Sequence, residues 1–306
     1  MSFSPHFLSS GDVVADRRYQ RALDFRMRGD LAAAADLLEQ ALELASGFAA
    51  AWFTLGEVRE ENGEADRAAM AFERALAADP ADRHGAVLRL ARLRGDRPGA
   101  MPPAYVTALF DQYAPLFDGA LIDQLRYRGP DQLRDLLARS QAPRPLHFAN
   151  MADLGCGTGL VAHAFRGLYD SIAGVDLSPK MVAEARRKGL YAHLAVGDML
   201  TFLERAPPVS FDLVIAADAF VYVGDLTALC AAAARALAPG GRLAFTVESH
   251  AGADFALGEK LRYAHGRAHI EAALAAAGLS VAAIEDASTR MERGVPVPSL
   301  LVVAST

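Results

Sequence analysis

Four aspartates stand where β-strands of the C-terminal half are expected to end. Asp153 precedes the glycine-rich segment 155–159, and Asp176, Asp198 and Asp218 each follow a later apolar run. A carboxylate can accept two hydrogen bonds at once, which suits a pair of ribose hydroxyls. Closely spaced glycines let backbone N–H groups approach a ligand at a helix N-terminus. The pattern therefore indicates a site that holds a nucleoside cofactor.

The spacing of the glycines separates two classes of nucleoside. Gly155, Gly157 and Gly159 stand one residue closer together than the Gly-x-Gly-x-x-Gly of dinucleotide sites. Asp153 beside this loop would repel a pyrophosphate and would attract a cationic amino group. The charge therefore favours a nucleoside that bears an amino acid over NAD(P), although Asp153 could instead brace the loop.

Strands and helices are expected to alternate from Leu146 onward. The expected strands are 146–154, 171–177, 191–196, 211–217, 242–247, 279–290 and 298–304, and the expected helices are 160–169, 179–188, 226–237 and 269–277. This alternation predicts an α/β domain with a Rossmann-like, seven-stranded sheet covered on both faces and closed by an antiparallel hairpin. Ligands of such sheets bind beyond the carboxyl ends of the strands, where the four aspartates lie.

Helical patterns before residue 100 repeat with a period of 34 residues, the distance from Gly29 to Gly63. The second copy resembles the tetratricopeptide repeat family, whose spacing is matched by Trp52, Leu55, Gly56, Ala68, Phe72, Ala75 and Pro80. Such repeats present a concave face to a peptide, so the unit could bind a protein or peptide partner. With only two copies, it could equally pack on the rest of the chain or mediate self-association, for example in a homodimer.

The segment 95–103 is rich in proline and glycine and is the expected domain boundary. We therefore expect an all-α tetratricopeptide domain over 1–97, linker and lid helices over 98–145, and the α/β domain over 146–306. The middle segment carries an aromatic series at near-helical spacing, which comprises Tyr105, Phe110, Tyr113 and Phe117. Such a series is typical of a core, and it would also suit a lid over the cofactor.

The motifs of the α/β domain resemble, in order and spacing, those of class I S-adenosylmethionine-dependent methyltransferases. The matching segments are Asp153–Gly159, Gly174–Met181, Gly197–Met199, Phe211–Asp218 and Ala238–Leu243. The resemblance covers 146–306 and implies S-adenosylmethionine as the cofactor and S-adenosylhomocysteine as the product. The pairing of this domain with tetratricopeptide repeats resembles a bacterial subgroup of the family.

The resemblance also implies which residues bind the cofactor. Asp153 and the backbone of Gly155, Gly157 and Gly159 would hold the methionine part. Asp176 would accept the ribose hydroxyls, and Asp198 would accept the adenine amino group. Further contacts would come from Cys156, Leu177, Met181, Met199, Asp218, Tyr105 and Tyr113. We expect the Cys156 side chain to point into the fold, and we expect neither a cysteine-based nor a metal-based mechanism.

The implied activity is methyl transfer to a small-molecule acceptor, or to one that a partner presents, mainly by alignment in a lidded cleft. The segment 218–222 lacks the Asn-Pro-Pro-Tyr of enzymes that methylate amino groups of nucleobases or glutamine. An alternative function is a tetratricopeptide interaction scaffold whose methyltransferase-like domain binds the cofactor without being the main activity.

A general base is required only if the acceptor must lose a proton. The candidates on the acceptor side are Tyr222, His250 and His265. His265 falls within 262–267, which we expect to be a substrate loop and which could instead be an ordinary surface loop. Arg290, Glu292 and Arg293 precede the final hairpin turn and could face the same site.

Composition limits the remaining classes of protein. The 306 residues contain no apolar run near the roughly 20 residues of a membrane helix. The N-terminus lacks a secretory signal, and Cys156 and Cys230 are too few for a disulfide framework. We therefore expect a cytoplasmic protein without a membrane partner. The formal net charge of −6 argues against a nucleic-acid partner.

Overall fold

The computed structural model describes residues 9–114, 126–141, 143 and 145–306. The chain forms two compact units, over 2–109 and 110–306. The division falls inside helix α6 (Pro103–Tyr113). Phe117 of the aromatic series lies outside the described residues. Among the described residues, no helix combines the length and the apolar character that crossing a bilayer requires.

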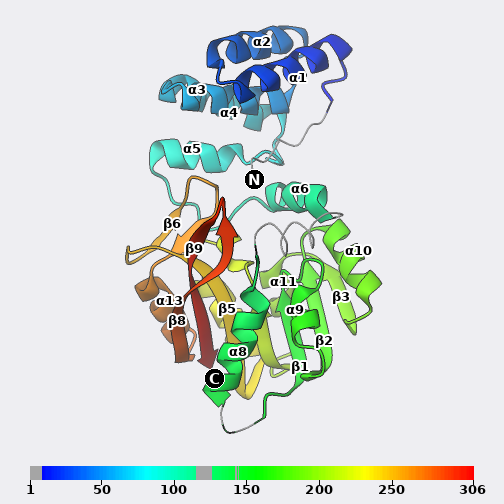
Figure 1. Cartoon of the computed structure of the whole chain (residues 1–306), viewed down its shortest axis with the longest axis vertical. Coiled ribbons are helices and arrows are strands. Elements are labelled where there is room, and N and C mark those ends of the chain that lie inside the picture. The colour runs from blue at the N-terminus through cyan, green and yellow to red at the C-terminus, as the bar shows by residue number, and fades with distance from the viewer. Residues whose placement is uncertain (1–8, 115–125, 142, 144) are drawn as a thin grey trace. The chain divides into compact units, whose positions relative to one another are not determined.

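The N-terminal unit consists of helix pairs (Figure 1). Its helices before α6 are α1 (Val13–Met27), α2 (Leu31–Leu44), α3 (Ala49–Glu61), α4 (Ala65–Ala78) and α5 (Ala86–Arg94). Gly29 and Gly63 occupy equivalent turns, after α1 and after α3, with φ of 80° and 78°. A Cβ on Gly56 would lie 2.5 Å from the ring of Phe72, so glycine is required for α3 and α4 to pack this closely. The period of the sequence therefore reports turns and helix packing, as predicted.

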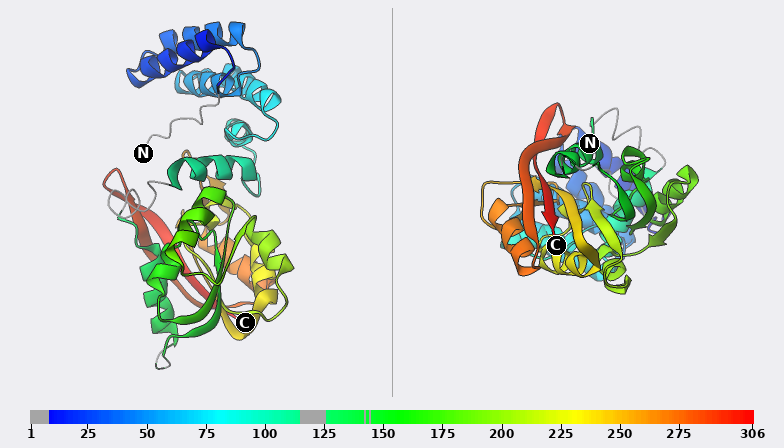
Figure 2. Two further views of the ribbon diagram at one scale, coloured as in Figure 1. Left: turned by 90° about the vertical axis from the view of Figure 1, so that its right-hand side faces the viewer. Right: turned by 90° about the horizontal axis from the view of Figure 1, so that it is seen from below.

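The C-terminal unit is built on a mixed sheet. Its seven long strands are β1 (Phe148–Leu154), β2 (Tyr169–Asp176), β3 (His193–Val196), β4 (Phe211–Ala216), β5 (Leu237–Ser249), β8 (Ser280–Glu292) and β9 (Val295–Ser305). They run in the order β3-β2-β1-β4-β5-β9-β8. The first five are parallel, and β9 is antiparallel to both neighbours. The sheet twists along its width, as Figure 2 shows.

Two short strands extend this sheet at the carboxyl end of β5. They are β6 (Phe255–Leu257) and β7 (Tyr263–His265), and β7 pairs in parallel with Glu248 and Ser249. The prediction of a loop over 262–267 is therefore wrong. The sequence analysis ended the preceding strand at Val247, whereas two further residues remain extended and offer β7 an edge.

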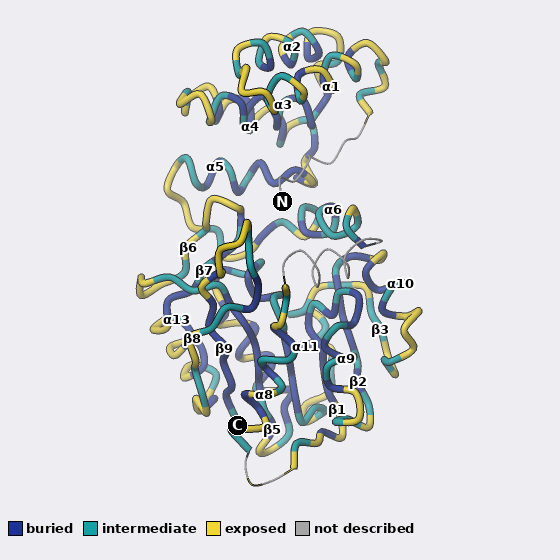
Figure 3. The backbone as a smooth tube through the Cα atoms, in the orientation of Figure 1, coloured by how far each residue is buried: buried dark blue, intermediate teal, exposed yellow. Residues whose placement is uncertain are grey.

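Helices cover both faces of the sheet. Leucines of α8 (Gly129–Gln141) and the helix α9 (Leu160–Ala164) pack on one face. On the other face lie α11 (Met199–Arg205), α12 (Thr227–Ala236) and α13 (Arg267–Ala276). The helix α10 (Pro179–Lys188) packs on β2 and β3. The central strands between these layers are largely buried (Figure 3).

One helix is shorter than predicted. The expected helix 160–169 ends at Ala164, because Gly167 adopts a φ of 82° and Tyr169 already pairs with Phe148 in the sheet. A buried Phe165 closes the helix and packs on the α8 side of the sheet. The short helix places its N-terminus, and therefore the glycine loop, directly above the ends of β1 and β2.

Candidate functional site

The glycine loop joins β1 to α9. Gly155, Gly157 and Gly159 have φ values of 67°, 52° and 91°, a region that residues with a Cβ rarely adopt. A Cβ on Gly155 would also lie 2.5 Å from Cβ of Ala219, which follows β4. The loop is thus pressed against the end of β4, with its backbone at the carboxyl edge of the sheet. This is the position in which α/β proteins hold a nucleoside.

Asp176 ends β2 and is tied to the same loop. One carboxylate oxygen accepts the N–H of Gly157 at 2.9 Å, and the other accepts the N–H of Ser178 at 2.8 Å. Only 9% of the residue is exposed. Burial raises the pKa of Asp176, and the two backbone hydrogen bonds lower it. Each oxygen keeps a second lone pair, so the carboxylate can still accept two ribose hydroxyls.

Asp153, at the end of β1, is fully buried. Its Oδ2 accepts a hydrogen bond of 2.6 Å from the Tyr191 hydroxyl, and its Oδ1 has no hydrogen-bond partner among the described residues. Burial raises the pKa of Asp153 to about 7. Both predicted roles remain compatible with this geometry, because Asp153 braces Tyr191 with one oxygen and keeps the other oxygen for a cation.

Other predicted cofactor residues lie near the loop in different environments. Met199 lies beside Gly155, its sulfur 3.7 Å from where a glycine Cβ would stand. Asp198 is exposed and caps α11 by accepting the N–H of Thr201 at 2.9 Å. Leu177 is half-buried after β2. Met181 is fully buried at the first turn of α10, so its side chain belongs to the core rather than to an open surface.

Cys156 is buried as predicted, and its N–H donates to the carbonyl of Val175. Burial raises the pKa of its thiol well above the usual range. The thiol therefore stays protonated and serves the packing of the loop. A reactive thiolate is not available at this position.

The helix α6 contributes Asp111, which the sequence did not single out, together with Phe110 and Tyr113 of the aromatic series. Asp111 accepts a hydrogen bond of 2.5 Å from the hydroxyl of Ser178, directly after Asp176. Phe110 meets Tyr222 edge to face, with ring centroids 5.3 Å apart. Tyr113 is half-buried, and burial raises its pKa. The end of α6 therefore lies at the carboxyl edge of the sheet, although only the aromatic series pointed to it.

Tyr105 is placed differently. It belongs to the N-terminal unit, where its ring lies 2.9 Å from the position of a Cβ on Gly85. Gly85 has a φ of 79° and leaves the space that the ring fills. This contact with Gly85 is a packing contact within the helical unit, and the expected role of Tyr105 in binding the cofactor stays a prediction.

Asp218 follows β4 and belongs to a buried ion network. It adopts a φ of 60°, and Nη1 of Arg290 donates to both carboxylate oxygens, at 2.6 and 2.5 Å. Arg290 also pairs with Glu248 and Glu292, which both pair with Arg262. Only 3% of the Arg290 side chain is exposed. Asp218 is therefore paired with Arg290 in this structure, and its expected contact with the cofactor stays a prediction.

Two of the expected bases have both ring nitrogens occupied or buried. His265 is fully buried in β7, and its Nε2 lies 2.9 and 3.0 Å from the carbonyls of Val223 and Gly224. Since carbonyls only accept, Nε2 carries the proton, and burial lowers the pKa of His265 to about 4. His265 is therefore a structural donor within the fold, which corrects its expected role as a base.

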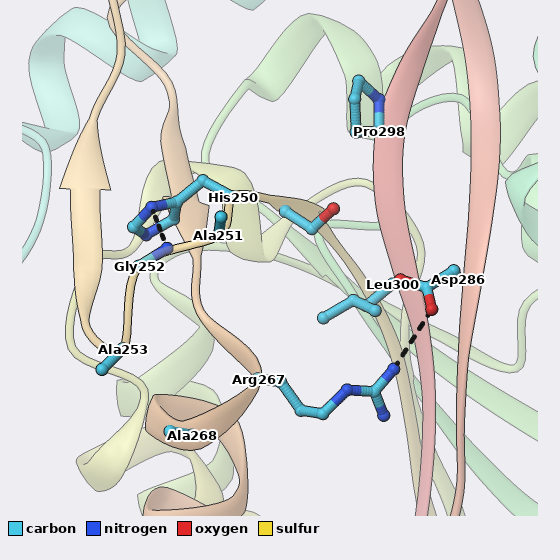
Figure 4. A pocket seen from close by; sticks show the side chains of 10 residues that line it. His250, Ala251, Gly252, Ala253, Arg267, Ala268, Asp286, Pro298 and Leu300 are labelled. Carbon is cyan, nitrogen blue, oxygen red and sulfur yellow. Dashed lines mark hydrogen bonds and ion pairs between the residues drawn. The ribbon is translucent and has the colours of Figure 1, made fainter.

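His250 lines a cavity of about 680 Å³ together with Arg267 and Asp286 (Figure 4). Its Nδ1 accepts the N–H of Gly252 at 3.1 Å, so Nε2 carries the proton and donates to the carbonyl of Asp254 at 2.7 Å. No residue of the glycine loop lines this cavity. The cavity that His250 lines is therefore not formed by the glycine loop, whereas Tyr222 lies beside Phe110 of α6.

The burial of His265 leads to a prediction about stability. The pKa is about 4 in the folded chain and about 6.5 when unfolded, so the unfolded chain binds more protons between these values. Neutral His265 contributes about 3 kcal/mol to the free energy of unfolding. This contribution is fully present above pH 6.5 and is lost as the pH falls towards 4. Asp153 acts in the opposite direction, because its pKa is raised on folding. We therefore expect the difference between wild type and His265→Gln, measured by chemical unfolding, to shrink across this interval.

The glutamine variant keeps an amide donor for the two carbonyls but cannot gain a proton. A constant difference between wild type and variant from pH 6.5 to 4.5 would contradict the prediction. Asp153 is unchanged in both proteins, so its contribution cancels in the comparison.

The described residues fit a nucleoside that carries an amino acid. Gly155, Gly157 and Gly159 adopt left-handed φ values, and their backbone lies at the edge of the sheet beside the buried carboxylate of Asp176. Asp153 supplies a buried oxygen without a partner. A pyrophosphate would meet two carboxylates here, whereas an ammonium group would be attracted.

Comparisons with known proteins agree with this fit. Residues 151–241 match the methyltransferase domain family, and residues 25–93 match the tetratricopeptide repeat family. A ubiquinone biosynthesis O-methyltransferase from Xanthomonas oryzae pv. oryzae is 34% identical over 112 residues, which are 36% of this chain and 47% of that protein. A malonyl-[acyl-carrier protein] O-methyltransferase from Enterobacter lignolyticus is 35% identical over 151 residues, which are 48% of this chain and 55% of that protein.

The chain spans about half the length of these curated relatives. Among solved structures, the [4+2]-cyclase SpnF is similar with a TM-score of 0.51 and 20% identity, covering 66% of this chain and 94% of that one. This likeness shows the fold alone. The chain thus contains one region that matches tetratricopeptide repeats and, after it in the sequence, one that matches the methyltransferase domain family.

Proposed function

We propose that this chain is an S-adenosylmethionine-dependent methyltransferase with N-terminal tetratricopeptide repeats, and that it methylates an oxygen atom of a small-molecule acceptor. The observation that supports the choice of oxygen is the ion network beyond β4 and β5. Its three acids, Asp218, Glu248 and Glu292, are each paired with arginine. Carboxylates held in these ion pairs are engaged, and we infer that the acceptor is one that arrives already ionised.

Glu292 shows how the ion network affects the pKa of one of its carboxylates. Burial raises its pKa, but the hydrogen bond from Lys260 and the charge of Arg262 outweigh burial and lower the pKa to about 2. An acid with so low a pKa does not take a proton from an amine or an alcohol near neutral pH. The network is thus suited to shaping and orienting an acceptor rather than to deprotonating it.

Methyl transfer to an ionised oxygen needs alignment more than proton transfer. When bound, the cofactor supplies a methyl group already activated by its sulfonium. The acceptor oxygen would form the new bond to carbon, and the electron pair of the broken carbon–sulfur bond would stay on sulfur. The chain holds the two reactants in line, with the glycine loop and Asp176 on one side, and with Tyr222, Phe110 and the ion network on the other.

Carboxylic acids and acidic phenols are the acceptors that meet these conditions. Both relatives reported above are O-methyltransferases by name, which supports an oxygen acceptor. The repeat unit is proposed to bind a protein or peptide partner, which could present the acceptor. The match to the tetratricopeptide family supports this part of the proposal.

The proposal is tested with the full chain and cofactor labelled in the methyl group. We expect label to enter carboxylic acids or acidic phenols of a defined panel and of fractionated cell extract, and to stay out of amines and simple alcohols. Methyl esters are recognised because alkali releases their label. Transfer to nitrogen, or cofactor binding without transfer to any fraction, would count against it, and the second outcome would favour the scaffold function. Asp176→Ala serves as the control without a cofactor site.

A further inference from the structure

Tyr191, in the turn between α10 and β3, occupies a slot made by two glycines. A Cβ on Gly159, in the glycine loop, would lie 3.0 Å from its ring. A Cβ on Gly174, within β2, would lie 2.8 Å from the same ring. The distance at Gly174 is shorter than real Cβ contacts, so the ring excludes a side chain there. The distance at Gly159 is tighter than most real contacts, and the φ of 91° at Gly159 also favours glycine. The slot therefore fixes the position of one aromatic side chain beneath the glycine loop.

The slot delivers the Tyr191 hydroxyl to Asp153. The hydroxyl donates to Oδ2 at 2.6 Å, while Oδ1 is buried without a hydrogen-bond partner among the described residues. A buried carboxylate oxygen without a partner is costly, and such atoms call for an explanation. Within the described part of the chain, no lysine, arginine or histidine pairs with Asp153. The missing interaction is therefore one that a cationic ligand group can supply.

We propose that Tyr191 is a positioning residue, which orients Asp153 and keeps it ionised so that it attracts the ammonium group of the cofactor. The proposal rests on the cofactor site described above and deepens it. Tyr191 acts through Asp153 and touches no reacting atom. Gly174 gains a role as well, because a side chain there would expel the ring.

The surroundings of Asp153 show why such help is needed. Burial raises its pKa, the Tyr191 hydrogen bond lowers the pKa, and the charge of Asp176 raises it again. The further titratable groups that interact with Asp153 are Cys156, Tyr169 and Tyr127, none of which is a cation. Tyr191 is thus the group that favours the ionised form before the cofactor binds.

This arrangement fixes how affinity depends on pH. Binding of a ligand with an ammonium group strengthens as Asp153 loses its proton near pH 7. Binding weakens again at higher pH, where the ligand's own amino group loses its proton. Without the Tyr191 hydroxyl, the pKa of Asp153 rises. In a plot of affinity against pH, the rising part then moves to higher pH and the maximum affinity falls.

The experiment compares two ligands by titration calorimetry on the full chain between pH 5.5 and 9. S-adenosylhomocysteine carries the amino acid part, and 5′-methylthioadenosine lacks it. For Tyr191→Phe we expect binding of S-adenosylhomocysteine to weaken about tenfold at pH 7, with a shifted pH profile, as for a lost hydrogen bond to a charged group. Binding of 5′-methylthioadenosine should stay unchanged, which also reports that the variant is folded.

A second variant separates positioning from packing. In Asp153→Asn, the ascending limb of the pH profile should disappear, and adding Tyr191→Phe should weaken binding little further. Equal weakening of both ligands, an unshifted pH profile, or full additivity of the two substitutions would overturn the proposal. If the wild type binds neither ligand, the cofactor site itself is wrong, an outcome distinct from normal binding that Tyr191→Phe leaves unchanged.

Discussion

Replacing Asp176 with alanine is expected to weaken binding of S-adenosylhomocysteine about 100-fold or more. Its carboxylate is proposed to accept two ribose hydroxyls, and each hydrogen bond to a charged group contributes about 1.5–3 kcal/mol. The same side chain holds the N–H groups of Gly157 and Ser178, which would lose their partners. The expected loss of affinity therefore includes a contribution from the glycine loop, which Asp176 no longer holds in place. Titration calorimetry with the full chain measures the effect.

Asp170 provides a matched control on the same strand. Its side chain is 69% exposed and lies 3.3 Å from Nε2 of His147, an exposed pair. Asp170→Ala should leave the affinity within about twofold, because exposed ion pairs contribute about 0–1 kcal/mol. Equal affinities of Asp176→Ala and wild type would show that the carboxyl end of β2 does not contribute to cofactor binding.

The second large effect concerns Arg290, which joins the β8–β9 hairpin to the ends of β4 and β5. In Arg290→Met, the carboxylates of Asp218 and Glu248 lose this partner in a mostly buried environment. Breaking a buried pair on one side costs about 3–5 kcal/mol. We expect the C-terminal unit to unfold at correspondingly lower denaturant concentration and methyl transfer to be lost. Circular dichroism and calorimetry follow the unfolding.

The chain contains internal controls for this measurement. Arg139 pairs with Glu285 in the same unit, but both side chains are about half exposed, so Arg139→Met should cost no more than about 1 kcal/mol. Trp52 is the single tryptophan and lies in the helical unit, so its fluorescence should report an unchanged transition for that unit. If Arg290→Met is as stable as Arg139→Met, the network is not a stabilising element.

The sequence alone determined the features that depend on local backbone and on periodicity. Left-handed φ values favour glycine, so the residue types alone predicted the loop at Gly155–Gly159. The strand–helix alternation predicted the seven long strands, and the 34-residue period predicted the helix pairs. Asp176 followed from its place after an apolar run, because the carboxyl ends of parallel strands share one edge.

The tertiary structure decided which side chains meet across distant parts of the chain. His265 looked like a loop residue, yet the extended end of β5 paired with it and buried it. Asp218 pairs with Arg290, 72 residues away, a partner that the sequence did not indicate. Sequence spacing carries no signal for such contacts, because they depend on strand register and on the packing of hairpins. The partnership of Tyr191 with Asp153 is of the same kind, since two separated glycines must first be brought together to admit the ring.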